Sequence, residues 1–201
     1  MNIAVLGAGH VGSTLGNKLS QAGHHVRYGV PDPTKYRHLR AVSVQEAAGA
    51  SEVVLLAVPW PAAERAIRAA GDLTGKIVVD CTNPLKPDLS GLALGYSDSA
   101  AECIARWAAG AKVCKAFNTT GADNMANPTF GDRTAAMFVC GDDPAAKQVV
   151  LAMTKAIGFE AVDAGPLAAA RLLEPLAMLW IHLAYGMKLG PGFAFGLLRR
   201  S

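Results

Sequence analysis

The sequence predicts an α/β protein with a Rossmann-type doubly wound, mostly parallel sheet and a short helical C-terminal segment. Apolar runs of strand length alternate with helical patterns over roughly the first 165 residues, and this alternation is typical of a sheet covered by helices on both faces. A glycine-rich turn follows the first apolar run directly. We therefore divide the chain into a sheet domain at residues 1–165 and a helical segment at residues 166–201.

The predicted elements follow from the spacing of apolar residues. Short apolar runs that end at glycine, proline or polar residues predict strands at 2–6, 25–28, 41–44, 53–58, 76–80, 111–117, 134–140 and 159–163. Apolar residues that recur every three or four positions predict helices at 11–22, 61–70, 100–109 and 144–157. Pro61 suits the first helical position, where its missing N–H would have no partner anyway.

The C-terminal segment is apolar on nearly every face between residues 167 and 187, so we expect it to be buried on most sides, with Pro175 kinking or dividing it. Its most apolar run, 176–187, is shorter than the ~20 residues of a membrane-spanning helix, so no membrane partner is predicted. This apolarity predicts a homodimer, with Trp180 and His182 at the interface or against the ligand cleft.

Composition narrows the class of protein further. The 201 residues are 51% hydrophobic and only 17% charged, with a net charge of +3, which excludes a disordered chain. The basic residues form no stripe, so no nucleic-acid partner is predicted. The 4 cysteines lack metal-ligand spacing, so we predict no metal site and interpret them as reduced thiols of a cytoplasmic protein.

The strongest motif is the turn Gly7-Ala8-Gly9-His10-Val11-Gly12, a GxGxxG between a strand and a helix. This context is the one that the dinucleotide-binding fingerprint requires. Gly7 permits the tight turn, Gly9 leaves room for a pyrophosphate, and Gly12 lets helix and strand pack closely. The helix N-terminus offers N–H groups and a partial positive charge to the phosphates. Residues 1–165 are therefore predicted to bind NAD(P).

The end of the second strand normally selects between the two nicotinamide cofactors. Here Val30 and Pro31 occupy it and offer neither a carboxylate for the ribose hydroxyls nor a cation for a 2′-phosphate. Asp32 would repel that phosphate, whereas Lys35 would attract it. Because of Lys35, the sequence favours NADP(H) over NAD(H) as the cofactor.

Three further segments follow strands at the edge where ligands of such folds bind, namely Val58-Pro59-Trp60, Thr82-Asn83-Pro84 and Asn118-Thr119-Thr120. Trp60 offers a flat face for stacking, and the amide and hydroxyl groups could bond a carboxamide or a substrate ring. Lys115 and Asn118 are weak catalytic candidates, and no convincing acid–base pair stands beside them. This suits a hydride transfer between two flat rings, where orientation dominates.

With these motifs the chain resembles the NADPH:coenzyme F420 oxidoreductases and their bacterial relatives and, more distantly, the cytosolic domain of the six-transmembrane epithelial antigen metalloreductases. The resemblance covers essentially the whole chain and rests on Gly7–Gly12, Val58–Trp60, Lys115–Thr119, Val139–Asp143 and Asp163–Leu167 followed by Arg171-Leu172.

The resemblance implies a homodimer that binds NADP(H), with a deazaflavin stacked on the nicotinamide and a C-terminal segment that helps to form the cleft. It places Ala8 to Val11 at the pyrophosphate, Lys35 at the 2′-phosphate, Val58 to Trp60 along the nicotinamide half, and Ala116 to Thr119 beside it.

Two departures from the family pattern matter. Val30-Pro31 stands where the family has Ser-Arg, and Asn118 stands where the archaeal enzyme has His. The second departure keeps a flavin open as the hydride acceptor instead of F420.

Three functions follow as hypotheses. The first is an NAD(P)H-dependent oxidoreductase that moves hydride between nicotinamide and F420 or a flavin, a small-molecule acceptor. The second is a reductase of a small carbonyl or imine, with Lys115 or His182 as the acid. The third is a redox-sensing module that binds NAD(P) without turnover.

Overall fold

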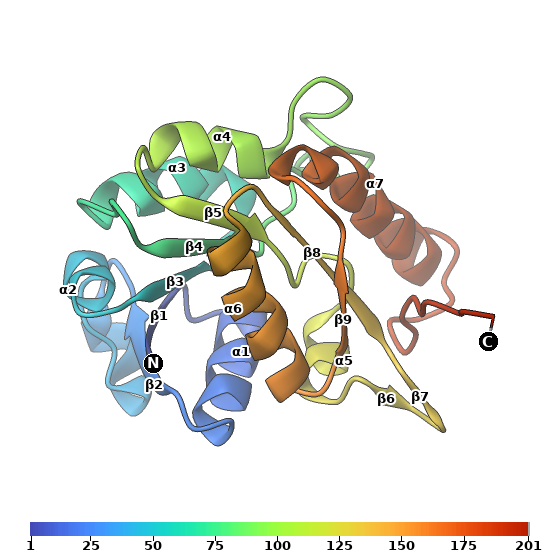
Figure 1. The fold of residues 1–201 in the computed structure, drawn as a ribbon, viewed down its shortest axis with the longest axis horizontal. Helices are drawn as coiled ribbons and strands as arrows, with labels where there is room; N and C mark the ends of the chain where they lie inside the picture. Colours follow the sequence, from blue (N-terminus) through green and yellow to red (C-terminus); the bar gives the residue numbers. More distant parts are fainter. Residues whose placement is uncertain (201) are drawn as a thin grey trace.

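A seven-stranded sheet runs through the computed structural model, which describes residues 1–200 (Figure 1). Its strands, in the order β2-β1-β3-β4-β5-β8-β9, are β2 (His25–Gly29), β1 (Asn2–Leu6), β3 (Val53–Leu56), β4 (Ile77–Asp80), β5 (Lys112–Lys115), β8 (Ala136–Gly141) and β9 (Glu160–Asp163). The first five in this order pair in parallel, whereas β8 runs antiparallel to β5 and carries β9 parallel to itself. The predicted α/β class with a mostly parallel sheet is confirmed.

Alternate residues of each strand point to opposite faces of the sheet, and each face has its own apolar core. In β1, Ile3 and Val5 belong to one core and Ala4 and Leu6 to the other. The helices that cover the first face are α1 (His10–Gln21), α5 (Ala122–Ala126) and α6 (Pro144–Ala156). The second face is covered by α2 (Val44–Gly49), α3 (Trp60–Ala69), α4 (Ala100–Trp107) and α7 (Ala170–Ile181).

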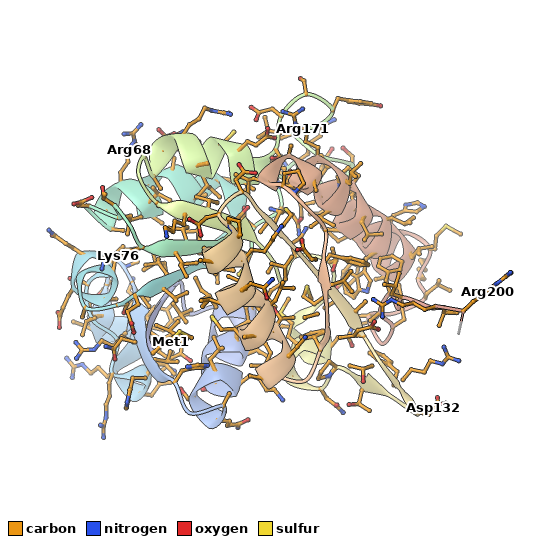
Figure 2. The ribbon with its side chains drawn as sticks, viewed as in Figure 1. Met1, Arg68, Lys76, Asp132, Arg171 and Arg200 are labelled. Carbon is orange, nitrogen blue, oxygen red and sulfur yellow. The ribbon has the colours of Figure 1, made fainter. Side chains whose placement is uncertain are left out.

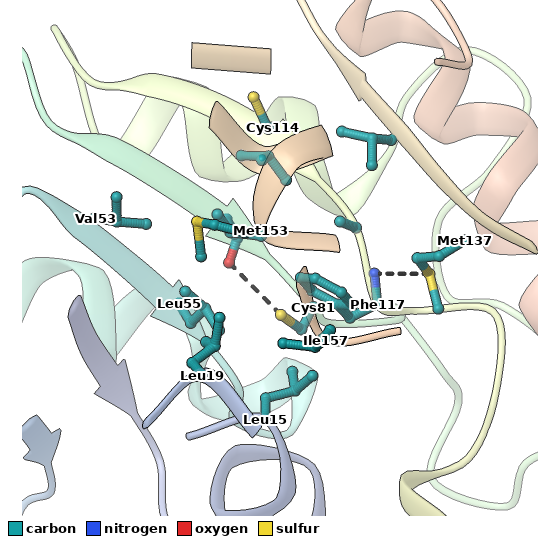
Figure 3. Close-up of a cluster of buried hydrophobic side chains, with 14 of the residues drawn as sticks. Leu15, Leu19, Val53, Leu55, Cys81, Cys114, Phe117, Met137, Met153 and Ile157 are labelled. Carbon is teal, nitrogen blue, oxygen red and sulfur yellow. Dashed lines mark hydrogen bonds between the residues drawn. The ribbon is translucent and has the colours of Figure 1, made fainter. Parts of the chain in front are cut away.

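Figure 3 shows part of the first core, where the side chains of α1 and α6 meet the strands. Within it the backbone N–H of Phe117 donates to the sulfur of Met137 across 3.1 Å. Phe117 has φ 58°, a conformation that a bulky residue rarely adopts. Strain of this kind is of order ~1–3 kcal/mol and gathers at functional sites. The positive φ of Phe117 lies in the turn directly after β5, just before Asn118.

The structure differs from the sequence prediction in several short elements. Residues 41–44 form no sheet strand, since Val42 makes only an isolated bridge to Gly29 and Val44 already begins α2. The hairpin β6 (Thr129–Phe130) and β7 (Arg133–Thr134) was not predicted, nor was α5. These elements have two or five residues, too few to set up a periodic pattern. A 3-10 helix at Pro33–Leu39 follows β2.

The C-terminal segment begins with a 3-10 turn at Leu167–Ala169, continues as α7 and ends in a π-helical turn at His182–Gly186. Pro175 lies inside α7 without dividing it. Within the single chain the segment buries only one of its faces. The prediction that it is buried on most sides is therefore wrong for one chain taken alone. Leu172 of the opposite face is 72% exposed.

The helical stretch Leu167–Gly186 has 20 residues and a mean hydropathy of 1.4, so by length and composition alone it could cross a membrane. The prediction counted the apolar run only from residue 176 and therefore underestimated its length. Of this window, 39% is buried inside the domain. An ion pair between Arg171 and Glu102 joins the start of α7 to α4, with Arg171 Nε 2.9 Å from the carboxylate. Figure 2 labels Arg171 at the start of α7, beside α4.

Candidate functional site

Two cavities lie where the parallel strands end. The β2-side cavity, of about 460 Å³, lies between the glycine turn, the end of β2 and helices α2 and α3. The β4-side cavity, of about 480 Å³, lies between α1, the start of α3 and the segment after β4. Val58 lines both, and we refer to the two adjoining cavities together as the groove. Strand order reverses at β1, and such a switch point is where open α/β sheets bind ligands.

Most of the residues predicted to bind a cofactor line this groove. Those in the β2-side cavity are Gly7, Val30, Pro31 and Val58. Those in the β4-side cavity are Gly9, His10, Val11, Val58, Pro59, Trp60 and Asn83. The predicted residues that line neither cavity are Ala8, Gly12, Lys35, Ala116, Asn118 and Thr119.

The glycine turn between the cavities has the geometry that the motif demands. Gly7 has φ +104°, and a Cβ there would lie 2.5 Å from the carbonyl oxygen of Ala57. A Cβ on Gly12 would lie 2.2 Å from the carbonyl oxygen of Gly7, whereas one on Gly9 would meet open space. No side chain caps the N-terminus of α1, which starts at His10. The first N–H groups of this 12-residue helix therefore remain available to an anion at the groove.

The loop after β2 keeps Lys35 away from the cavity lining. Lys35 lies 3.7 Å from the Asp32 carboxylate, and its side chain is 75% exposed. The hydrogen bond from Thr34 and the nearby Lys35 ammonium lower the pKa of Asp32, so this carboxylate stays charged at the end of β2. The cation that does line the β2-side cavity is Arg65 of α3.

Sequence reasoning missed Arg65, although its helix carries the pattern that reveals it. Ala62, Arg65, Ala66 and Ala69 all line the cavity, and they recur at the three- and four-residue spacing of one helix face. Small residues around a single arginine leave space beside its guanidinium, and this pattern is visible without coordinates.

Trp60 lines the β4-side cavity and also stacks on Trp107 of α4, with ring centroids 5.4 Å apart and planes inclined by 24°. One face of the indole is thus covered by the protein. The stack fixes the ring at the N-terminus of α3, so Trp60 forms a rigid wall of the cavity.

The polar residues after β4 and β5 bond to one another. Asn83 Nδ2 donates to the carbonyl oxygen of Asn118 (2.9 Å), and Asn118 Nδ2 donates to Asn83 Oδ1 (3.0 Å) and to the carbonyl oxygen of Leu173 (3.1 Å). Thr82 Oγ1 and Asn118 Oδ1 are buried without a hydrogen-bond partner. Because an unpaired buried polar atom is costly, these two atoms are candidates to bind a polar group of a ligand.

Ala116 and Thr119 lie beneath this edge rather than in the groove. Ala116 is fully buried and donates its N–H to the carbonyl oxygen of Asp80. The Thr119 hydroxyl donates to the sulfur of Met137. These two bonds tether the chain on either side of Phe117 and Asn118.

Lys115 is enclosed and has all of its donors in use. Its Nζ lies 2.6 Å from Asp80 Oδ2, 2.8 Å from Glu174 Oε1 and 2.8 Å from the carbonyl oxygen of Thr82. Burial acts to lower the pKa of Lys115, but the carboxylates of Asp80 and Glu174 outweigh it and raise the pKa above its ordinary value. An ammonium with three acceptors and a raised pKa holds its proton, so the geometry favours a structural role over proton donation.

His182, the other candidate acid, is exposed at the start of the π-helical turn and lines neither cavity of the groove. The four cysteines are free and buried. Among the residues that the structure describes, no group of three or more histidine, cysteine or carboxylate side chains could hold a metal ion.

Comparison with known proteins identifies the family. Residues 2–84 match the family model described as NADP oxidoreductase, coenzyme F420-dependent. The F420-dependent NADP reductase of Methanothermobacter marburgensis is 30% identical over 207 residues, covering 91% of this chain and 92% of the relative. Rat metalloreductase STEAP3 is 34% identical over 185 residues, although the chain spans only 37% of its length.

Solved structures agree with this relationship. The crystal structure of a candidate F420-dependent NADP reductase from an Arthrobacter species superposes with a TM-score of 0.89 at 34% identity and covers 99% of this chain and 100% of the other. A reductive aminase from Aspergillus terreus shares the fold, with a TM-score of 0.69 at 18% identity. The chain therefore belongs to the family of coenzyme F420-dependent NADP oxidoreductases, to which the N-terminal domains of the STEAP metalloreductases are related.

Proposed function

We propose that this NADP-dependent oxidoreductase transfers hydride between NADP(H) and coenzyme F420 in the groove formed by the two cavities. One observation carries the proposal: a glycine turn and an uncapped helix N-terminus stand between two cavities at the switch point of the sheet. Relatives whose names specify F420-dependent NADP reduction support F420 as the second substrate.

The residues present fit a dinucleotide. The space beside Gly9 and the free N–H groups at the start of α1 suit a pyrophosphate. The β2-side cavity, with its apolar lining and the Arg65 guanidinium, suits the adenosine half. Thr82 lines the β4-side cavity, and its unpaired hydroxyl oxygen suits the carboxamide of the nicotinamide. When bound, NADP(H) supplies or accepts the hydride.

The protein's own part in such a reaction is to orient and enclose. Trp60, held by Trp107, forms a rigid wall beside the reacting ring, and the Asn83–Asn118 pair fixes the opposite edge. Apart from the buried Cys81, the titratable side chains that line the β4-side cavity are His10 and Lys86, and they form no buried acid–base pair. The proton that accompanies hydride on its way to F420 can therefore come from solvent.

The decisive experiment mixes the purified protein with NADPH or NADH and then with F420, FMN or FAD, and follows absorbance of the nicotinamide and of the acceptor. We expect NADPH to be oxidised when F420 is present. Oxidation with FMN or FAD alone would replace F420 by a flavin. Oxidation with none of the three would overturn the proposal, and tight NADPH binding without turnover would then indicate a sensing module.

We also propose that the protein is a homodimer joined through α7. Leu172 and Leu179 are 72% and 47% exposed on the face of α7 that the single chain leaves open, and Tyr185 and Met187 beyond it are 59% and 60% exposed. An apolar helix face of this kind is typical of an interface between subunits. Light scattering should give the dimer mass, and Leu172→Glu with Leu179→Glu should give a folded monomer. A wild-type monomer would contradict the dimer.

A further inference from the structure

A cluster of buried charges lies behind the β4-side cavity. Asp80 on β4 and Lys115 on β5 are register partners in the sheet, and Glu174 of α7 completes the cluster. The side chains of Asp80 and Lys115 are 0% exposed and that of Glu174 is 1% exposed. Burial raises the pKa of Glu174, although the Lys115 ammonium acts in the opposite direction. Burying three ionisable groups costs desolvation free energy, so we expect the cluster to have a structural or functional role.

The cluster fixes both ends of the segment between β4 and α4. At the first end, Lys115 Nζ donates to the carbonyl oxygen of Thr82, and the N–H of Thr82 donates to Asp80 Oδ1 at 2.8 Å. At the second end, the N–H groups of Ala100 and Ala101 donate to the Glu174 carboxylate at 3.1 and 3.4 Å. The whole segment, residues 81–99, is therefore held at its two ends by one connected set of charges.

This segment forms a wall of the β4-side cavity. The residues of it that line the cavity are Cys81, Thr82, Asn83, Leu85, Lys86, Pro87 and Leu89. The segment contains no regular helix or strand apart from one isolated bridge between Leu85 and Leu92. Backbone bonds such as those from Lys86 N–H to the Gly91 carbonyl and from Ala93 N–H to the Pro84 carbonyl close turns within the segment, while its two anchored ends fix its position against the sheet and α7.

Helix α7 reaches the cavity wall by a second contact next to Glu174. The carbonyl oxygen of Leu173 accepts a hydrogen bond from Asn118 Nδ2, which also binds Asn83. Two successive residues of α7 are thus joined to the polar edge of the groove. Leu173 is joined through the side-chain amide of Asn118, and Glu174 is joined through the charge cluster.

We propose that Glu174 is a positioning residue: from the C-terminal helix it holds Lys115 and the first turn of α4, and so sets the shape of the 81–99 wall that binds the nicotinamide half of the cofactor. This inference rests on the proposed function for its ligand. It makes α7 a part of the cofactor site, in addition to any contact with a second subunit. Lys115 transmits the effect and lines neither cavity of the groove.

The test compares Glu174→Gln with Arg171→Gln. The first keeps the side-chain volume and an acceptor oxygen but removes the charge from the cluster. The second is the matched control, because it breaks the ion pair of Arg171 with Glu102 between the same two helices and leaves the anchors of the segment intact. Circular dichroism and thermal unfolding establish that both variants fold.

We expect Glu174→Gln to raise the Kd for NADPH roughly tenfold, as when a hydrogen bond to a charged group is lost. Hydrogen exchange of amides in residues 82–101 should become faster in this variant, while exchange in β1 and α1 stays unchanged. Arg171→Gln should leave both readouts within about twofold of wild type. A folded Glu174→Gln protein with wild-type affinity and wild-type exchange would overturn the proposal.

A measurement on the wild-type protein tests the same coupling without any substitution. Binding of NADPH should slow exchange of the Ala100 and Ala101 amides, which lie behind the wall and donate to Glu174. Unchanged exchange at saturating NADPH would overturn the inference. A wild-type protein that binds neither NADPH nor NADH would instead reject the proposed function, and faster exchange of 82–101 in Glu174→Gln would still support the anchoring.

Discussion

Asn83 and Asn118 bind each other reciprocally across the ends of β4 and β5: each side-chain amide donates to the other residue, at 2.9 and 3.0 Å. The two residues are 35 positions apart in the chain, and their pairing turns two separate loops into one rigid edge. The remaining oxygen of Asn118 faces no protein donor. The protein thus fixes both side chains in place and leaves one acceptor atom, Asn118 Oδ1, without a hydrogen-bond partner.

Asn118→Asp should destabilise the fold and weaken cofactor binding. A carboxylate cannot donate to Asn83 Oδ1 or to the carbonyl oxygen of Leu173, so two buried acceptors lose their partner. We expect a loss of about 1–3 kcal/mol in the free energy of unfolding, measured by urea denaturation. The same change at Asn17, which is exposed on α1, should alter this free energy by less than about 0.5 kcal/mol. Equal stability of both variants would refute the assignment.

Substitutions at two glycines of the turn should have different effects, one on cofactor binding and the other on stability. Gly9→Ala should fold like the wild type, because a Cβ there meets nothing within 4 Å, but it should bind NADPH poorly since the methyl group enters the space offered to the pyrophosphate. Gly12→Ala should unfold more readily, by about 1–3 kcal/mol, because its Cβ would lie 2.2 Å from a backbone oxygen. Titration with NADPH and thermal unfolding distinguish the two effects. Normal NADPH affinity in Gly9→Ala would argue against a pyrophosphate at the turn.

Arg65 should matter more than Lys35 for the affinity for NADPH. Arg65 lines the β2-side cavity, whereas Lys35 lies outside its lining beside Asp32. We expect Arg65→Ala to raise the KM for NADPH about tenfold and Lys35→Ala to raise it less than about threefold. The same measurements with NADH show what the guanidinium binds. If it contacts the adenine, Arg65→Ala should raise the KM for both cofactors. If it contacts the 2′-phosphate, only the KM for NADPH should rise. The reverse ranking of the two variants would restore Lys35 as the phosphate ligand.

Stability should fall in acid partly through the Glu102–Arg171 pair. The hydrogen bond from Arg171 lowers the pKa of Glu102 below its ordinary value of 4.5. A lowered folded-state pKa means that the pair stabilises the protein above about pH 4.5 and that this contribution is lost as the pH falls through the folded-state value. Because both side chains are partly exposed, solvent screens the pair and its contribution to the free energy of unfolding is small. Unfolding free energies of wild type and Arg171→Gln should therefore converge at low pH.

The buried thiols should resist alkylation in the folded protein. Burial raises the pKa of Cys114 to about 12 and that of Cys140 to about 11, and it also raises that of Cys81. Since the thiolate is the reactive form, iodoacetamide near neutral pH should modify these residues roughly a hundredfold more slowly than in the urea-unfolded chain. Mass spectrometry after timed labelling measures the ratio. Fast labelling of Cys114 without unfolding would contradict the packing described.

The fold was predictable because its main determinants are local. Strands β1, β3 and β8 contain continuous apolar runs, and the Gly7–Gly12 turn fixes the first strand and helix. The short strand predicted at 41–44 failed because Ser43 caps α2, accepting from the N–H of Glu46, and so starts a helix within that range. The direction of β8 could not be derived, since an apolar run does not reveal whether its partner is parallel.

The site was predictable at the strand ends but not where it depends on pairing across the sheet. Val58, Trp60 and Asn83 follow strands whose carboxyl ends meet at one edge, so their position follows from the topology. The role of Lys115 depends on its register with Asp80 and on a helix that starts 55 residues later, at Ala170. A lysine at the end of an apolar strand indicates a buried partner, but only the three-dimensional structure identifies which carboxylates serve it.

The reversal of strand direction at β8 has a consequence for how this protein can be modified. Beyond β5 the sheet presents the opposite strand ends to the groove, so β8, α6 and β9 contribute no residue to either cavity of it. This unit therefore acts as a scaffold that can tolerate redesign of its outer face. The tip of the hairpin between β6 and β7, at Gly131 and Asp132, also lies outside the linings of both cavities, so we expect a tag or surface linker attached there to leave the groove unchanged.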